Sequence, residues 1–81
     1  LFPRHEAKVS VFDAGFVLGD GVWEGLRVHP GPDGRGVVAF LDRHFKRLWE
    51  GAKTLDFAMG LTKEALAKRL YDCLDANSGH E

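Results

Sequence analysis

The sequence predicts an α+β fold, in which a small antiparallel sheet has two helices packed on one of its faces. The first half of the chain holds three apolar, β-rich stretches separated by turns that contain glycine. The second half holds two stretches in which apolar residues recur at helical spacing. Strands followed by helices are typical of a two-layer domain, since each layer buries its apolar face against the other. With 81 residues, we expect one small domain spanning residues 1–81.

Three stretches predict the strands of the sheet. Polar and apolar side chains alternate in residues 8–11, which lead into Phe12. In residues 22–29, a mostly apolar set alternates with Trp23, Gly25, Arg27 and His29. The third stretch, residues 37–40, is short, apolar and β-rich. Alternation with a period of two is typical of a half-buried strand, because successive side chains point to opposite faces. Residues 30–36 contain Pro32-Asp33-Gly34, a turn signal that predicts an antiparallel hairpin between the second and third strands.

Residues 13–21 separate the first two strands and hold three glycines and two aspartates. This composition predicts a structured turn. A phosphate-binding loop is not expected, because the stretch lacks the glycine spacing of nucleotide-binding motifs and the helix that follows them. We expect Asp13 and Asp20 to stabilise the turn through bonds from backbone N–H groups to their carboxylates.

Two amphipathic helices are predicted after residue 41. Asp42 is the predicted N-cap of the first, because its carboxylate can accept backbone N–H bonds in the first turn. Thr62 is the predicted N-cap of the second, which we expect to end at residues 77–79. The apolar stripe of the first helix is Phe45, Leu48, Trp49, Ala52 and Leu55, and that of the second is Leu66, Leu70, Cys73 and Leu74. These stripes are expected to cover the sheet.

Charge and composition exclude several classes of function. The formal net charge is −1 at pH 7, so we expect no nucleic-acid partner. No apolar run approaches the roughly 20 residues of a membrane-spanning helix, and no membrane partner is expected. The histidines do not have metal-ligand spacing, and we expect no metal site. Cys73 is the only cysteine, which favours a reducing, cytoplasmic compartment. The chain begins with Leu1, so we expect a fragment or a processed product.

One face of the predicted strand at residues 22–29 is a candidate binding surface. Trp23, Gly25, Arg27 and His29 fall on this face, opposite a mostly apolar one. Gly25 would let a ligand approach the backbone closely, and Arg27 would supply a cation for a carboxylate. The same face could instead pack on a neighbouring domain, with Arg27 paired to a buried carboxylate.

Arg47 is the second candidate. A guanidinium is a planar donor fork that suits a phosphate group. Alone, however, Arg47 also fits a solvated helix arginine that pairs with Glu50, since the two residues lie one turn apart.

Four sequence elements together resemble a known enzyme family. They are Asp13-Ala14-Gly15, Gly19-Asp20-Gly21, Glu24 and His44-Phe45-Lys46-Arg47-Leu48. Their combination resembles the N-terminal small domain of the fold-type IV aminotransferases, which use pyridoxal 5'-phosphate. The resemblance implies that Arg47 contacts the cofactor phosphate. It also implies a substrate-binding role for Trp23, Gly25, Arg27 and Leu18, the last reaching into the partner subunit's site.

The run Glu24-Gly25-Leu26-Arg27 is more similar to the branched-chain members of this family than to the others. The resemblance therefore implies transfer of an amino group between a branched-chain amino acid and a 2-oxo acid, in a homodimer or higher homo-oligomer. In the family, the lysine that binds the cofactor lies in a second domain. We expect residues 1–81 to lack that lysine, to have no catalytic residue of their own, and to be inactive alone.

Two alternatives stay open. One is a D-amino acid or (R)-amine transaminase of the same fold. The other is a non-catalytic α+β interaction module whose Trp23, Arg27 and His29 bind a protein partner, because exposed tryptophan and arginine are common interface anchors. Convergence of Arg47 and Trp23 on one concave surface would favour the cofactor site, whereas Arg47 projecting alone into solvent would favour the module.

Overall fold

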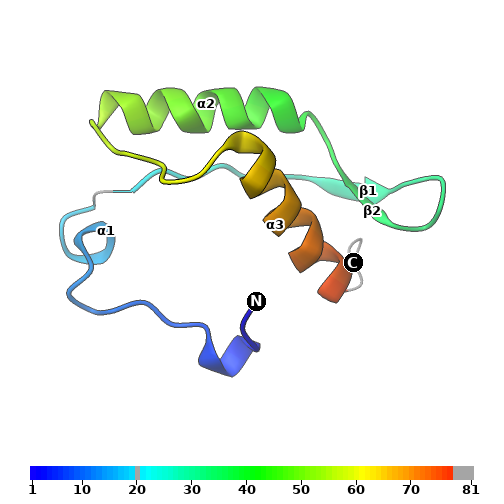
Figure 1. Ribbon diagram of the computed structural model, residues 1–81, viewed down its shortest axis with the longest axis horizontal. Coiled ribbons are helices and arrows are strands. Elements are labelled where there is room, and N and C mark those ends of the chain that lie inside the picture. The colour runs from blue at the N-terminus through cyan, green and yellow to red at the C-terminus, as the bar shows by residue number, and fades with distance from the viewer. Residues whose placement is uncertain (20, 78–81) are drawn as a thin grey trace.

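The computed structural model describes residues 1–19 and 21–77, and Figure 1 shows their arrangement. The elements in chain order are the 3₁₀ turn η1 (Arg4–Glu6), α1 (Ala14–Val17), β1 (Val28–Pro30), β2 (Gly36–Val38), α2 (Leu41–Thr54) and α3 (Lys63–Ala76). A two-stranded antiparallel sheet and two long helices make a small α+β fold. The predicted fold class is therefore confirmed.

The hairpin of β1 and β2 is the predicted one. Val28 pairs with Val38 and Pro30 with Gly36. The connection closes with a bond of 2.7 Å from the Gly31 N–H to the Arg35 carbonyl. A Cβ atom on Gly31 would lie 2.7 Å from Val37 Cγ2, so the turn has room only for glycine. Beyond the regular pairing, the Ala39 N–H donates to the Arg27 carbonyl at 2.8 Å.

The other predicted strands are shorter or absent. In the described part of the chain, residues 8–12 form no strand, and regular pairing in the stretch 22–29 begins only at Val28. A strand needs a partner to satisfy its backbone groups. Neither residues 8–12 nor residues 22–27 has a regular partner strand, so both stretches stay irregular.

α2 does not begin at the predicted cap. Its N-cap is Phe40, which has the left-handed backbone angles φ 54° and ψ 39° and makes no side-chain cap bond. The prediction for Asp42 was wrong, because Asp42 lies inside the first turn, where its carboxylate still faces the positive end of the helix dipole. The predicted stripe is partly buried: Phe45 is 6% exposed and Ala52 1%. Leu55, at the C-cap, is exposed.

α3 begins as predicted, since the Thr62 hydroxyl accepts a hydrogen bond from the Ala65 N–H at 3.1 Å. Its predicted apolar face is half-buried except for Cys73, which is exposed. Tyr71 is half-buried instead, and its hydroxyl accepts a 3.1 Å hydrogen bond from the Val38 N–H of β2. The inward face of α3 is therefore the predicted one, with Tyr71 in place of Cys73. The helix was predicted to end at residues 77–79: Asn77 is its C-cap, and residues 78 and 79 lie outside the described residues.

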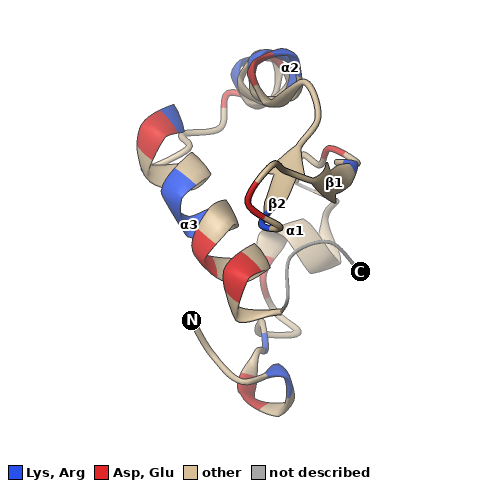
Figure 2. Cartoon of the chain, turned by 90° about the vertical axis from the view of Figure 1, so that its right-hand side faces the viewer, with Lys and Arg blue, Asp and Glu red and all other residues tan. Residues whose placement is uncertain are grey.

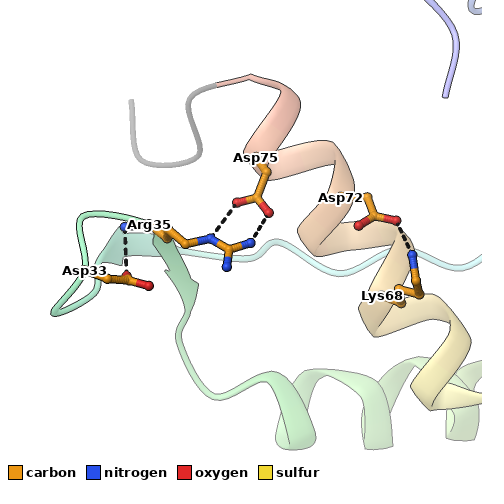
Figure 3. A network of polar contacts seen from close by, with 5 residues as sticks. All are labelled: Asp33, Arg35, Lys68, Asp72 and Asp75. Carbon is orange, nitrogen blue, oxygen red and sulfur yellow. Dashed lines mark hydrogen bonds and ion pairs between the residues drawn. The ribbon is translucent and has the colours of Figure 1, made fainter.

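Two ion pairs involve the C-terminal half of α3, one to the hairpin and one within the helix (Figure 3). The Arg35 guanidinium in the hairpin pairs with Asp75, and Lys68 pairs with Asp72 one turn away at 2.8 Å. Acidic residues gather toward the C-terminal end of this helix (Figure 2). That end carries the negative pole of the helix dipole, which disfavours carboxylates. The two cations offset this repulsion, and Arg35 also ties the helix to the hairpin.

Residues 1–19 run away from the helices and the hairpin in an open arc (Figure 1). Asp13 makes the predicted bond to the backbone, since its Oδ1 accepts from the Gly15 N–H at 2.8 Å, but it does so as the N-cap of the short helix α1, where only a turn was predicted. Asp20, the other predicted turn-stabilising carboxylate, lies outside the described residues. Every side chain of this segment is exposed, so the segment adds nothing to the core.

Candidate functional site

The irregular segment 21–27 separates its side chains into two faces. Val22, Glu24 and Leu26 are half-buried, whereas Trp23, Gly25 and Arg27 are exposed. The predicted two-face pattern is therefore confirmed by burial, although the segment has no regular strand partner. Extended backbone alone is enough to keep the period of two.

Glu24, on the inner face, is bonded to two side chains of α2. Its Oε2 atom lies 2.6 Å from His44 Nδ1 and 2.8 Å from Arg47 Nη2. A carboxylate only accepts hydrogen bonds, so His44 Nδ1 carries a hydrogen toward Glu24. The contact of 3.3 Å between Arg47 Nη2 and His44 Nδ1 then brings two donors together without a bond between them. We call Glu24, His44 and Arg47 the carboxylate cluster.

Helical spacing brings this cluster together. Residues three and four apart share one face of a helix, so His44, Arg47 and Gly51 form a row along α2. Val22 lies against the end of that row, where a Cβ on Gly51 would be 3.4 Å from Val22 Cγ1. The Val22 side chain therefore lies against the backbone of α2 at Gly51, two residues before Glu24.

The cluster lies between the interior and the solvent. The side chains of Glu24 and His44 are 16% and 17% exposed, whereas that of Arg47 is 65% exposed. The hydrogen bond from Arg47, and then that from His44, lowers the pKa of the Glu24 carboxyl below its ordinary value. Glu24 in turn raises the pKa of Arg47. The carboxylate and the guanidinium therefore stabilise each other's charged form.

Arg47 also lines an open depression of about 430 Å³ at the N-terminal half of α2. Its other lining residues are Phe40, Arg43, His44, Lys46 and Glu50. With Arg47 included, the lining holds three cations and one carboxylate, so the depression favours an anion. Only one nitrogen of the Arg47 guanidinium bonds to Glu24 among the described residues, which leaves the rest of the fork available. These residues fit a phosphate group.

The structure does not bring the remaining predicted site residues into this depression. Trp23 is 86% exposed, and Gly25 and Arg27 are exposed beside it on the outer face of their segment. Leu18 is exposed in the N-terminal arc, next to Gly19 with φ +73°. Arg47 does not project alone into solvent, because it is bonded to Glu24. Glu24 is the sequence neighbour of Trp23. Trp23 does not line the depression at Arg47, but lines a second open cavity together with Glu24 and Phe45.

Sequence reasoning missed the role of Glu24. Glu50 was the partner considered for a solvated Arg47, but the ion pair that the structure describes is with Glu24. A signal was present: Glu24 stands at an inward position between the apolar Val22 and Leu26. A carboxylate at such a position needs a partner, because burial without one is costly.

The described residues hold no grouping typical of a metal centre and no membrane-spanning helix. Within 1–19 and 21–77, no three His, Cys, Asp or Glu side chains are grouped as a metal ion would require. Among the helices of the same residues, none combines the length and the apolar character needed to cross a membrane.

Sequence comparison gives matches over nearly the whole chain. No family model matches the sequence. A protein of Methanocaldococcus jannaschii, provisionally named a branched-chain-amino-acid aminotransferase, is 42% identical over 73 residues, which are 90% of this chain and 24% of the relative. Branched-chain-amino-acid aminotransferase-like protein 2 of Arabidopsis thaliana is 40% identical over 95% of this chain and 13% of its own length. D-alanine aminotransferase of Bacillus licheniformis is 30% identical over 95% of this chain and 25% of its own length. The chain thus spans a quarter or less of these relatives.

Proposed function

We propose, from the match of nearly the whole chain to a segment of the fold-type IV branched-chain and D-alanine aminotransferases, that this chain is the phosphate-binding part of a pyridoxal-phosphate-dependent aminotransferase. In this proposal, residues 1–81 are the N-terminal small domain of the enzyme. The amino group passes between an amino acid and a 2-oxo acid.

The observation that carries the proposal is the exposed guanidinium of Arg47 in a cationic depression. Its fork is held at one nitrogen by Glu24 and is otherwise available. Arg43 and Lys46 add positive charge nearby. Phosphate binds well to an arginine fork because two parallel N–H groups match two of its oxygens. Arg47 would therefore hold the phosphate of the cofactor, which when bound supplies the aldehyde that carries the amino group and a ring that acts as an electron sink.

Branched-chain amino acids are the proposed substrate class. The relatives named as branched-chain aminotransferases or aminotransferase-like proteins are 38–42% identical, whereas the D-alanine aminotransferases are 30–33% identical. Trp23, Gly25 and Arg27 would form part of the substrate pocket, with Trp23 as an apolar wall. Leu18 would reach the site of a partner subunit.

A homodimer or higher homo-oligomer in the cytoplasm completes the proposal. The apolar side chains of residues 1–18, such as Phe12 at 88% exposed, need a covering surface that the described chain does not supply. We also propose that residues 1–81 do not catalyse transamination alone. All five lysines are exposed, whereas a lysine that binds a carbonyl cofactor is activated by desolvation or by a neighbouring cation.

The test is the visible absorbance of the full-length protein that contains this chain, before and after adding pyridoxal 5'-phosphate and then an amino donor. We expect a cofactor band that is bleached by L-valine or L-leucine. Arg47→Ala should weaken cofactor binding by at least tenfold, because it removes a charged donor pair. Arg69→Ala, which removes an exposed cation of α3, is the matched control. Protein that takes up no cofactor would contradict the proposal and favour the interaction module.

A D-amino acid transaminase is the second candidate, and the 30–33% identity to D-alanine aminotransferases favours it. The same absorbance experiment separates the two. Bleaching by D-alanine without bleaching by L-valine would identify the D-amino acid enzyme, and bleaching by an (R)-amine would identify an amine transaminase.

A further inference from the structure

We propose that Glu24 is a positioning residue, which fixes the Arg47 guanidinium in the orientation that receives a phosphate group. This inference deepens the proposed function and rests on it. It assigns to Glu24 a role in anion binding although its own charge is negative.

The first support is the geometry of the bonds. A single oxygen atom, Oε2 of Glu24, accepts from both His44 and Arg47. The two donors stand one helical turn apart, on the same face of α2. The same oxygen therefore accepts from one largely buried donor, His44, and from one exposed donor, Arg47. The bond to His44 keeps Glu24 in place while Arg47 is held at one nitrogen only.

The second support is the contrast in exposure. Glu24 and His44 are largely buried, but the Arg47 side chain is 65% exposed. An exposed arginine samples many rotamers, and it loses this freedom when it binds an anion. An arginine already tied at one nitrogen loses less, so it binds more tightly.

The third support is the balance of charge in the depression. Glu24 repels an anion, but Arg47 neutralises that charge, and Arg43 and Lys46 outnumber the remaining carboxylate of Glu50. The depression stays positive overall. The Glu24 carboxylate weakens the attraction of the depression for an anion, but it orients the Arg47 guanidinium. This combination is what we expect of a positioning residue.

The experiment compares two ligands of the full-length protein, pyridoxal 5'-phosphate and pyridoxal, which lacks the phosphate. The dissociation constant of pyridoxal divided by that of pyridoxal 5'-phosphate, both measured with the cofactor-free protein, gives the preference for the phosphorylated ligand. This ratio reports the phosphate contribution without any measurement of activity. We expect Glu24→Gln to reduce the preference for pyridoxal 5'-phosphate over pyridoxal about tenfold, because a neutral amide oxygen holds the guanidinium less strongly than a carboxylate. In an Arg47→Ala background, Glu24→Gln should have no further effect, because the residue acts through Arg47.

Asp75→Asn is the matched control. It removes another carboxylate that pairs with an arginine of a different element, Arg35, outside the depression. The ratio should not change in this variant.

The outcomes separate the two proposals. If Arg47→Ala removes the phosphate contribution and Glu24→Gln leaves it intact, the positioning role is wrong and the phosphate anchor stands. The positioning role is also contradicted if, in the double variant, Glu24→Gln reduces the ratio further by the same factor as it does alone. If Arg47→Ala leaves the ratio unchanged, the proposed phosphate anchor itself is wrong, and the positioning role with it.

A measurement on the unmodified protein covers the case in which Glu24→Gln does not fold. We expect the Arg47 Nη nitrogens to give distinct, slowly exchanging NMR signals in the cofactor-free protein, since one of them is bonded to Glu24. A single averaged signal would show a freely rotating guanidinium and would overturn the inference.

Discussion

Residues 22–77 and residues 1–19 are both rich in apolar side chains, yet only the first region buries them. The buried apolar side chains of the described chain, Val38, Phe45 and Ala52, lie in residues 22–77. In residues 1–19, Phe12 and Val9 are 88% and 76% exposed. The difference is the presence of a surface to pack against: α3 contacts β2, and Phe45 of α2 and Leu66 of α3 line one cavity, while the N-terminal arc lies apart from them (Figure 1). Apolar content therefore predicts burial only where a second layer is at hand.

The largest expected effect tests this contrast at its centre. Phe45→Ala should reduce the free energy of unfolding by about 3 kcal/mol, the low end for a buried phenylalanine, because Phe45 already lines an open cavity and part of its contact area is missing. Phe12→Ala should change it by less than about 0.5 kcal/mol. Urea unfolding of the chain, followed by tryptophan fluorescence, measures both values. Similar losses for the two variants would mean that residues 1–19 are packed in solution.

The next effect tests the hairpin of the packed region. Gly31→Ala should cost about 1–3 kcal/mol, because the added methyl would meet Val37 at 2.7 Å and the Arg35 carbonyl at 3.0 Å. Gly34→Ala has open space around it but a positive φ of 80°, so it separates steric crowding from backbone strain. Urea unfolding of both variants gives the comparison. A Gly31→Ala protein as stable as the parent would show that this turn can open.

A pH effect tests the carboxylate cluster, where the packed region meets the solvent. Because the pKa of Glu24 is lowered in the folded chain, its charge stabilises the fold fully above the ordinary value of 4.5, and this contribution is lost as the pH falls through the lowered pKa. We expect Glu24→Gln to be less stable than the parent at pH 7, and the gap to close below 4.5.

Thermal unfolding between pH 7 and pH 3 measures this gap. In an Arg47→Ala background the gap should narrow at every pH above 4.5, since Arg47 is the main cause of the lowered pKa. If the difference in stability between the parent and Glu24→Gln stays constant from pH 7 to pH 3, Glu24 acts through packing alone.

The smallest expected effect is a gain. Gly51→Ala should stabilise the chain by about 0.5–1 kcal/mol, because alanine favours the interior of a helix over glycine. The added methyl would lie 3.4 Å from Val22 Cγ1, which is ordinary contact. Gly51→Leu should instead push residues 22–24 away from α2 and weaken the bond from Arg47 to Glu24. Thermal unfolding of both variants tests whether the helix row sets the position of this segment.

Much of the packed region could be predicted from local patterns. Pro32-Asp33-Gly34 predicted the hairpin turn, Thr62 the start of α3, and the alternation around Glu24 the two faces of its segment. These features depend on residues near one another in the sequence. The strand expected at residues 8–12 failed because a strand depends on a partner, and alternation alone cannot supply one.

The candidate site was harder to predict for the same reason. Arg47 could be proposed from its residue type and its sequence context, but its partner Glu24 stands 23 residues away. The sequence neighbours of Arg47 favoured Glu50, whereas the fold brings Glu24 to it. The start of α2 at Phe40 was missed because its left-handed backbone is unfavourable for a bulky residue. Asp42 was the better local choice for a cap.

The hydrogen bond from the Val38 N–H to the Tyr71 hydroxyl spans 33 residues of sequence. A two-stranded hairpin is marginal by itself in water, and here one amide of β2 is shielded by a side chain of α3. This bond ties the hairpin to α3, so we expect the Val38 amide to exchange its hydrogen with solvent slowly while α3 stays packed on β2. The amides of residues 1–12, which have no such tie, should exchange faster.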